Sequence, residues 1–118
     1  MNKDIVGEFV HFYYKCLNDN TVGHLIPHLK DNSKFIRHNI ELVGTENITN
    51  GITKTALIYT PLKFDIMING DRRANIMITG KVQDLENKSS TSYSEYLLFS
   101  LSNKKEYWIH SSILHLIY

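Results

Sequence analysis

The sequence is poor in the residues that cross-link or anchor a chain. Its single cysteine, Cys16, cannot form a disulfide within the chain and falls among apolar residues, as a small core side chain would. No apolar run approaches the roughly 20 residues that a membrane-spanning helix needs. The first residues also lack the pattern of a signal peptide. We therefore expect a soluble, intracellular protein with no membrane partner.

An excess of charge of one sign is missing as well. Thirteen Lys and Arg residues balance twelve Asp and Glu residues, which leaves a formal net charge of +1. The basic residues form no cluster longer than a pair, such as Arg72 with Arg73. Proteins that bind nucleic acid through its phosphates usually carry a basic patch or run. We therefore expect no direct nucleic-acid partner.

The length of 118 residues suits one hydrophobic core and is too short for two. The sequence has no internal repeat and no linker, so we predict a single domain over residues 1–118.

The stretch from Asp4 to Asn18 predicts an amphipathic helix around which the rest of the chain packs. Its apolar residues recur at steps of three and four, and Asp4 is a suitable N-cap. Large rings widen the apolar stripe to more than half of the helix surface, so this helix needs a concave partner. An ordinary amphipathic helix on a flat sheet is the alternative. The stripe consists of Ile5, Val6, Phe9, Tyr13, Cys16 and Leu17.

Shorter elements follow. Residues 21–29 predict a weak helix that Pro27 bends, and residues 34–39 and 40–43 predict two short strands. A second amphipathic helix is predicted to open at residues 44–46, with Thr45 as N-cap, and to end at Pro61. Its inward face would carry Ile48, Ile52, Thr55, Ala56 and Tyr59.

From Leu62 onward the apolar period changes from 3.6 to 2, which is typical of strands. The Asn69-Gly70 pair is a strong hairpin signal. The predicted architecture is α+β, with the helices segregated to one face of an antiparallel sheet. The four long strands are predicted at residues 62–69, 74–82, 93–101 and 107–118.

The last two strands show no clean division into an apolar and a polar face. A sheet with one face in water should show that division. We therefore expect both faces to be covered, one by helices and the other by a protein partner in a homo- or heterodimer; a monomer with exposed aromatic side chains is the alternative. The predicted interface residues are Tyr96, Leu98, Trp108, His110 and Leu114.

Several motifs resemble the nuclear transport factor 2-like family. Phe9, Tyr13 and Tyr14 match the pattern of the family's first helix, Gly44 and Ile48 match the opening of a later helix, and residues 75–82 match a strand ending near Gly80. The resemblance covers essentially the whole chain. It implies a curved antiparallel sheet that forms a cone around the N-terminal helix.

The family includes transport proteins, adaptor domains and enzymes. The given sequence shows no RNA-binding or disordered tail, which favours the transport proteins. The Ran-GDP carrier has a cavity rimmed by carboxylates, and the corresponding positions here are His38, Asp84 and Glu86, a thin acidic rim. The resemblance therefore implies the small subunit of a heterodimeric mRNA export receptor, which docks on Phe-Gly repeats of the nuclear pore and shuttles between nucleus and cytoplasm. The homodimeric Ran-GDP import carrier is the alternative.

The third hypothesis is an isomerase or dehydratase of the same fold. Candidate proton-transfer groups are Asp65 and the histidines His24, His28 and His38, but no nucleophile elbow, phosphate loop or useful pair of carboxylates is present. His24 and His28 are four residues apart, yet Pro27 disrupts their helix and no third metal ligand is evident. We therefore expect a non-catalytic protein with no metal and no cofactor.

Overall fold

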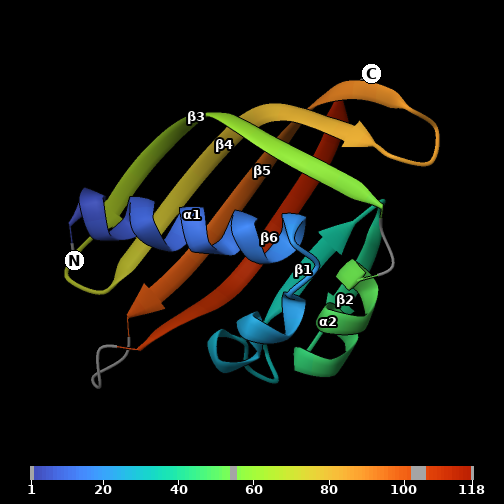
Figure 1. Ribbon diagram of the computed structural model, residues 1–118. Helices are drawn as coiled ribbons and strands as arrows, with labels where there is room; N and C mark the ends of the chain where they lie inside the picture. The colour runs from blue at the N-terminus through green and yellow to red at the C-terminus, as the bar shows by residue number, and fades with distance from the viewer. Residues whose placement is uncertain (1, 54–55, 102–105, 118) are drawn as a thin grey trace.

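The computed structural model describes residues 2–53, 56–101 and 106–117. Three helical segments precede and interleave with six strands (Figure 1). No helix in these described segments is long and apolar enough to span a bilayer. The elements are α1 (Lys3–Asn18), the 3₁₀ helix η1 (Val22–His28), β1 (Lys34–Arg37), β2 (Ile40–Val43), α2 (Thr45–Thr53), β3 (Leu57–Asn69), β4 (Arg73–Asp84), β5 (Ser89–Leu101) and β6 (Tyr107–Ile117).

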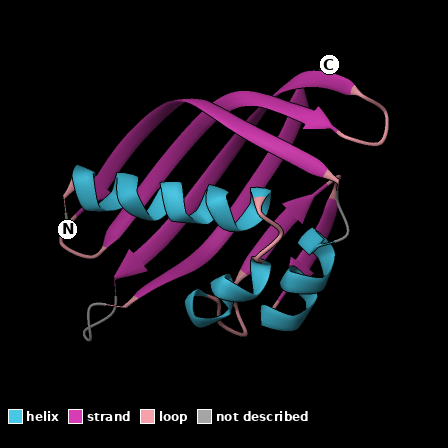
Figure 2. Cartoon of the chain, viewed as in Figure 1, coloured by secondary structure: helices cyan, strands magenta, loops and turns pink. Residues whose placement is uncertain are grey.

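The six strands form one curved, unclosed sheet in the order β2-β1-β6-β5-β4-β3. All neighbouring strands are antiparallel except β1 and β6, which are parallel. The helix α1 lies across the concave side of the sheet, and the other helices lie at the end where β1 and β2 are found (Figure 2). We call the helix-covered side the inner face and the opposite side the outer face. The predicted fold class, a curved sheet around the N-terminal helix, is confirmed.

The helix α1 buries one broad face against the sheet. Val6, Phe9 and Tyr13 of the predicted stripe are buried in the core, as the three- and four-residue spacing predicts. Ile5, also predicted to face inward, is exposed, and Val10, which lies outside the predicted stripe, is fully buried. The N-cap is Asn2 and not Asp4: the Asn2 side-chain oxygen accepts a hydrogen bond from the Ile5 backbone N–H at 2.9 Å. Asp4 instead stands in the first turn, where a negative charge favours the helix dipole.

The boundary between α2 and β3 differs from the prediction. The helix ends at Thr53, and Tyr59 and Pro61 belong to β3; Thr55 lies outside the described residues. The residues at helical steps were misleading because Tyr59 points inward from a strand, where it is buried. Pro61 is tolerated because β3 is an edge strand with a register shift between Pro61 and Lys63.

Gly80 of β4 allows the backbone of β3 to pass close to it, because glycine has no side chain. A Cβ atom at Gly80 would lie 2.2 Å from the carbonyl oxygen of Thr60. The bulge in β3 and the bare backbone of β4 therefore occur at the same point of the sheet, where Pro61 is in register with Gly80. Bulges and glycines bend strands, and both favour curvature around α1.

The hairpin between β3 and β4 turns where the Asn-Gly pair predicts. Gly70 has a φ of 67°, a left-handed conformation that glycine adopts without strain. Positive φ angles also occur at His38 and Asn39, the two residues that join β1 to β2.

A bulge in β6 shifts its register with β5. Leu98 is in register with Ser111, whereas the next residue, Phe99, is in register with Ile109. His110 is therefore an extra residue on β6, and the alternation of its side chains changes at that point.

This shift changes which side chains of β6 face the core. Ile109 is buried before the bulge, and Ser112 and Leu114 are buried after it. The prediction that Leu114 lies on the outer face is wrong, because strict alternation from Trp108 does not count the extra residue. Ile113 takes the outer position instead, in register with Tyr96.

Replacing Phe9 by alanine tests whether α1 is the centre of the core. The Phe9 ring packs against Phe99 and Tyr107, with ring centroids 4.7 and 5.2 Å away. We expect Phe9→Ala to lower the free energy of unfolding by about 3–5 kcal/mol, the usual range for an aromatic side chain truncated in a core. The same change at Phe64, which is exposed on β3, should cost much less. Equal losses in urea denaturation would contradict the central role of α1.

Candidate functional site

The inner face contains a buried carboxylate, Glu95 of β5, which is fully inaccessible to solvent. The hydroxyls of Tyr13 and Tyr14 donate to its two oxygens, each at 2.6 Å. The Arg37 guanidinium lies 3.1 Å from the same carboxylate and also donates to the Tyr13 oxygen at 3.0 Å. Glu95 and Arg37 thus form an ion pair on the inner face of the sheet, and the two phenols of α1 complete the hydrogen bonds to its carboxylate.

The sheet order brings these groups together. Leu114 of β6 is in register with Arg37 on one side and with Glu95 on the other. Ser112, two residues earlier on the same face, accepts from Arg37 at 3.0 Å and donates to Glu95. Adjacent Tyr13 and Tyr14 both reach the carboxylate because they straddle the inward side of α1.

Burial and the neighbouring carboxylate fix the protonation of the phenols. Burial raises the pKa of Tyr13 and Tyr14 well above the usual value of 10.0, and the negative charge of Glu95 raises it further. Burial alone would lower the pKa of Arg37, but the oxygens of Tyr13 and Glu95 raise it. The cluster is therefore built from neutral hydrogen-bond donors and one fixed cation around the carboxylate.

Two further tyrosines extend this cluster. Burial raises the pKa of Tyr59 to about 12 and also raises that of Tyr93. Their rings meet edge to face, with centroids 5.2 Å apart. The Tyr93 hydroxyl is buried and has no hydrogen-bond partner among the described residues.

Little space adjoins the cluster. The cavity that reaches Arg37 has a volume of about 10 Å³, which is about the space of one water molecule. It is lined by Leu17, Arg37, His38, Ile52 and Tyr59. This cavity therefore has room for about one water molecule beside Arg37.

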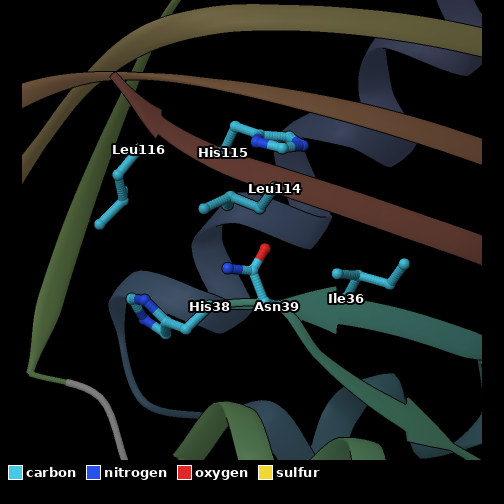
Figure 3. A pocket seen from close by; sticks show the side chains of 6 residues that line it. All are labelled: Ile36, His38, Asn39, Leu114, His115 and Leu116. Atoms are coloured by element: carbon cyan, nitrogen blue, oxygen red, sulfur yellow. The ribbon is translucent and has the colours of Figure 1, made fainter. Parts of the chain in front are cut away.

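A larger hollow of about 280 Å³ opens where β1 ends and β6 continues. Figure 3 shows Leu114, His115 and Leu116 along β6, opposite His38 and Asn39 in the turn that follows β1. The hollow is lined by these five residues and Ile36. It combines an apolar floor with two imidazoles and an amide and contains no carboxylate.

The predicted acidic rim is divided between different places. His38 lines the hollow beside β6, whereas Asp84 lines a neighbouring one of about 380 Å³, and Leu116 belongs to both. The Asp84 carboxylate accepts from the backbone N–H groups of Glu86 and Asn87 at 3.0 and 3.2 Å, and from the Asn87 amide at 3.1 Å. Asp84 thus shapes the turn before β5, and Glu86 lines neither hollow.

The outer face carries a group of apolar side chains that none of the described helices covers. We call it the outer patch; none of its members is buried. Tyr96 and Leu98 of the predicted interface belong to it, whereas Leu114 faces inward. The outer patch consists of Ile36, Met77, Tyr96, Leu98 and Ile113.

Trp108 and His110 lie at one end of the outer patch. Trp108 is in register with Ser100, whose hydroxyl lies 2.6 Å from His110 Nε2. The Lys30 ammonium lies 3.9 Å from the centroid of the Trp108 ring, a cation–π geometry. Burial lowers the pKa of His110, and the positive charges of Arg73 and Lys30 lower it further.

The sequence of the chain also matches a known family. A family model of the nuclear transport factor 2 (NTF2) domain matches residues 5–116. The chain belongs to the NTF2 family. The resemblance inferred from Phe9, Tyr13 and Tyr14 is thereby confirmed. A search of curated proteins finds no significant match.

Solved structures share the NTF2-like fold at low sequence identity. Nuclear transport factor 2 from Cryptosporidium parvum has a TM-score of 0.82 at 17% identity, covering 94% of this chain and 90% of that one. The yeast UBP3-associated protein BRE5 has a TM-score of 0.79 at 19% identity, covering 98% of this chain and 95% of that one. A ketosteroid isomerase-like protein from Erwinia carotovora has a TM-score of 0.78 at 12% identity, covering 100% of this chain and 99% of that one. Such identities establish the fold and leave the function open.

Three of the four residues considered for catalysis, Asp65, His24 and His38, are exposed. The Asp65 carboxylate is exposed, 3.9 Å from Lys63. His28 lies against Phe9, with its Nδ1 2.8 Å from the Tyr107 carbonyl oxygen, and His24 is exposed. In residues 2–53, 56–101 and 106–117, no three His, Cys, Asp or Glu side chains are grouped to hold a metal ion.

Sequence reasoning missed the Glu95–Arg37 pair. Glu95 alternates along its strand with Tyr93 and Leu97, which are also buried. A carboxylate inside an otherwise apolar strand face was the available signal, because ionised side chains are almost never buried unpaired.

Removing the carboxylate tests the buried pair. We expect Glu95→Gln to lower the free energy of unfolding by about 3–5 kcal/mol, because Arg37 is left as a buried, uncompensated charge. The double variant with Arg37→Met should lose less than the sum of the single losses. The matched control is Asp65→Asn, which disrupts an exposed pair and should cost less than about 1 kcal/mol. Additive losses in urea denaturation would mean that the two residues are not coupled.

Alkaline titration tests the tyrosine cluster. Tyr13, Tyr14, Tyr59 and Tyr93 keep their protons above pH 10.0 in the folded state, whereas in the unfolded chain they ionise near that value. The folded state then binds more protons, so stability is fully present below pH 10.0 and falls as the pH rises toward about 12. Phenolate absorbance should rise for these residues only together with loss of the circular dichroism signal. Their ionisation in a still-folded protein would contradict the cluster.

Proposed function

We propose that this chain is a non-catalytic adaptor that binds a protein partner through the outer patch. The observation that carries this proposal is the uncovered apolar centre of the sheet. Every described helix lies on the inner side or at the β1–β2 end, so no helix of the described residues covers Tyr96, Leu98 and Ile113. Neighbouring apolar side chains that remain partly accessible to solvent are characteristic of interaction surfaces.

The closed interior supports a non-catalytic role. A general acid or base must reach a substrate within hydrogen-bond distance. Both oxygens of Glu95 accept hydrogen bonds from its neighbours, and the adjoining cavity holds about 10 Å³. A substrate would have to displace Arg37 or Tyr13 before it could reach the carboxylate.

The finer form of the proposal is a role in nucleocytoplasmic transport. The chain would be the small subunit of a heterodimeric mRNA export receptor, found in nucleus and cytoplasm and at the nuclear pore, and the heterodimer would dock on Phe-Gly repeats. Membership of the NTF2 family over residues 5–116 supports this role. Phenyl rings bind weakly to small apolar sites, so several sites acting together would supply the avidity.

The distribution of carboxylates favours this role over a homodimeric Ran-GDP import carrier. A basic surface of a GTPase would need free carboxylates at the rim. His38 occupies one rim position, and the Asp84 carboxylate already accepts three hydrogen bonds within its own turn. Ran-GDP should therefore bind weakly to this chain.

Affinity purification tests the proposed function. We expect the tagged chain to retain, in equal amount, a larger protein that contains a related domain, and the pair to bind immobilised Phe-Gly repeats but not Ser-Gly repeats. Tyr96→Glu, which places a charge in the outer patch, should abolish retention with the helix signal unchanged. His11→Glu, on the exposed side of α1, is the matched control and should retain the partner.

A parallel measurement with purified Ran-GDP separates the two transport roles. Stoichiometric retention of Ran by a homodimer of this chain would overturn the export role in favour of the import carrier. Turnover of a steroid-like ketone that depends on Glu95 would overturn the adaptor proposal as a whole.

A further inference from the structure

The charges of the outer face are distributed unevenly. The carboxylates that alternation within the strands places on it are Glu41 of β2 and Asp65 of β3. Each is paired with an exposed lysine: Glu41 with Lys34 at 3.8 Å and Asp65 with Lys63 at 3.9 Å. These two ion pairs are exposed and electrically balanced. They contribute no net charge to the surface.

The central strands contribute charge of one sign only. In the described parts of β4, β5 and β6, the Lys, Arg, Asp and Glu side chains that alternation places on the outer face are Arg73 and Lys81, both exposed. Glu95, the carboxylate in the middle of β5, points inward, where Arg37 neutralises it. The outer face therefore carries net positive charge although the chain as a whole is nearly neutral.

These cations stand at both ends of the outer patch. Arg73 is in register with Ser100, beside the end where Lys30 covers Trp108. Lys81 is eight residues along β4, about 27 Å away at the usual rise of a strand, and its ammonium donates to Ser92 at 2.8 Å. Met77 of the outer patch lies between them. We call Lys30, Arg73 and Lys81 the cationic rim.

From this arrangement we infer that the outer patch takes a partner surface with an apolar centre flanked by carboxylates, and not a second copy of this chain. The inference rests on the proposed function and deepens it by naming the chemistry of the partner. In an isologous dimer the same face meets itself, so two cationic rims would be brought together. Like charges across an interface disfavour association, and complementary charges favour it.

A charge-reversed copy of the chain serves as a defined acidic partner. In the variant Arg73→Glu with Lys81→Glu, both exposed cations of β4 become carboxylates around an unchanged outer patch. We expect sedimentation equilibrium at low salt to show that the wild-type chain binds this variant on the order of tenfold more tightly than it binds itself. The preference should shrink near 1 M salt, where the Debye length is about 3 Å.

Two controls identify the surface responsible. Lys3→Glu with Lys15→Glu makes the same change of net charge on the exposed side of α1, and this variant should gain no preference for the wild-type chain. Tyr96→Glu in the wild-type partner should abolish the mixed complex, because it disrupts the outer patch itself.

The outcomes separate this inference from the proposed function. If wild-type chains bind one another as well as they bind the Arg73/Lys81 variant, or if neither pair associates, the inference of an acidic partner is overturned. If the preference is present but Tyr96→Glu leaves it intact, the outer patch is not the docking surface, and the proposed function fails together with the inference. A salt-sensitive preference that Tyr96→Glu removes supports both.

Discussion

The carboxylate of Glu95 under α1 is the constraint on which the rest of the structure depends. A buried charge is costly unless a counter-charge and hydrogen bonds compensate it. The chain meets this requirement with groups from three other elements: the phenols of α1, Arg37 at the end of β1 and Ser112 of β6. The pair therefore fixes the rotation of α1 and the position of β1 beside β6. It also fills the space in which a ligand could otherwise lie.

Local patterns predicted those parts of the fold that depend on neighbouring residues. The spacing of Phe9 and Tyr13 predicted the inward side of α1, and the Asn69-Gly70 pair predicted the hairpin. Glu95 and Arg37 are 58 positions apart, and no local pattern records such a pairing. The parallel contact of β1 with β6 is of the same kind. It brings together segments that the sequence keeps far apart, so it could be reached only through the family resemblance.

The errors arose where one residue interrupts a regular period. Tyr59 fits a helical step from Ile52, yet it lies in a strand, where its inward direction looks the same in sequence. Pro61 was read as the end of a helix, although an edge strand with a bulge accommodates it equally well. In β6 the extra residue His110 exchanges the faces of every later side chain, and this is why Leu114 was assigned to the wrong side. A one-residue shift leaves the amino-acid composition unchanged, but it moves every later side chain of the strand to the other face of the sheet.

The charge of the outer face also depends on which side chains each strand turns outward. Thirteen basic and twelve acidic residues suggest a chain without electrostatic preference, but net charge does not record which way each side chain points. The one carboxylate of the central strand β5, Glu95, is turned inward and neutralised by Arg37, whereas Arg73 and Lys81 of β4 are turned outward. The buried Glu95–Arg37 pair is neutral and adds no charge to either face, so the central strands take their outward charge from Arg73 and Lys81. The direction of these few side chains, and not the overall composition, therefore sets the charge of the outer face.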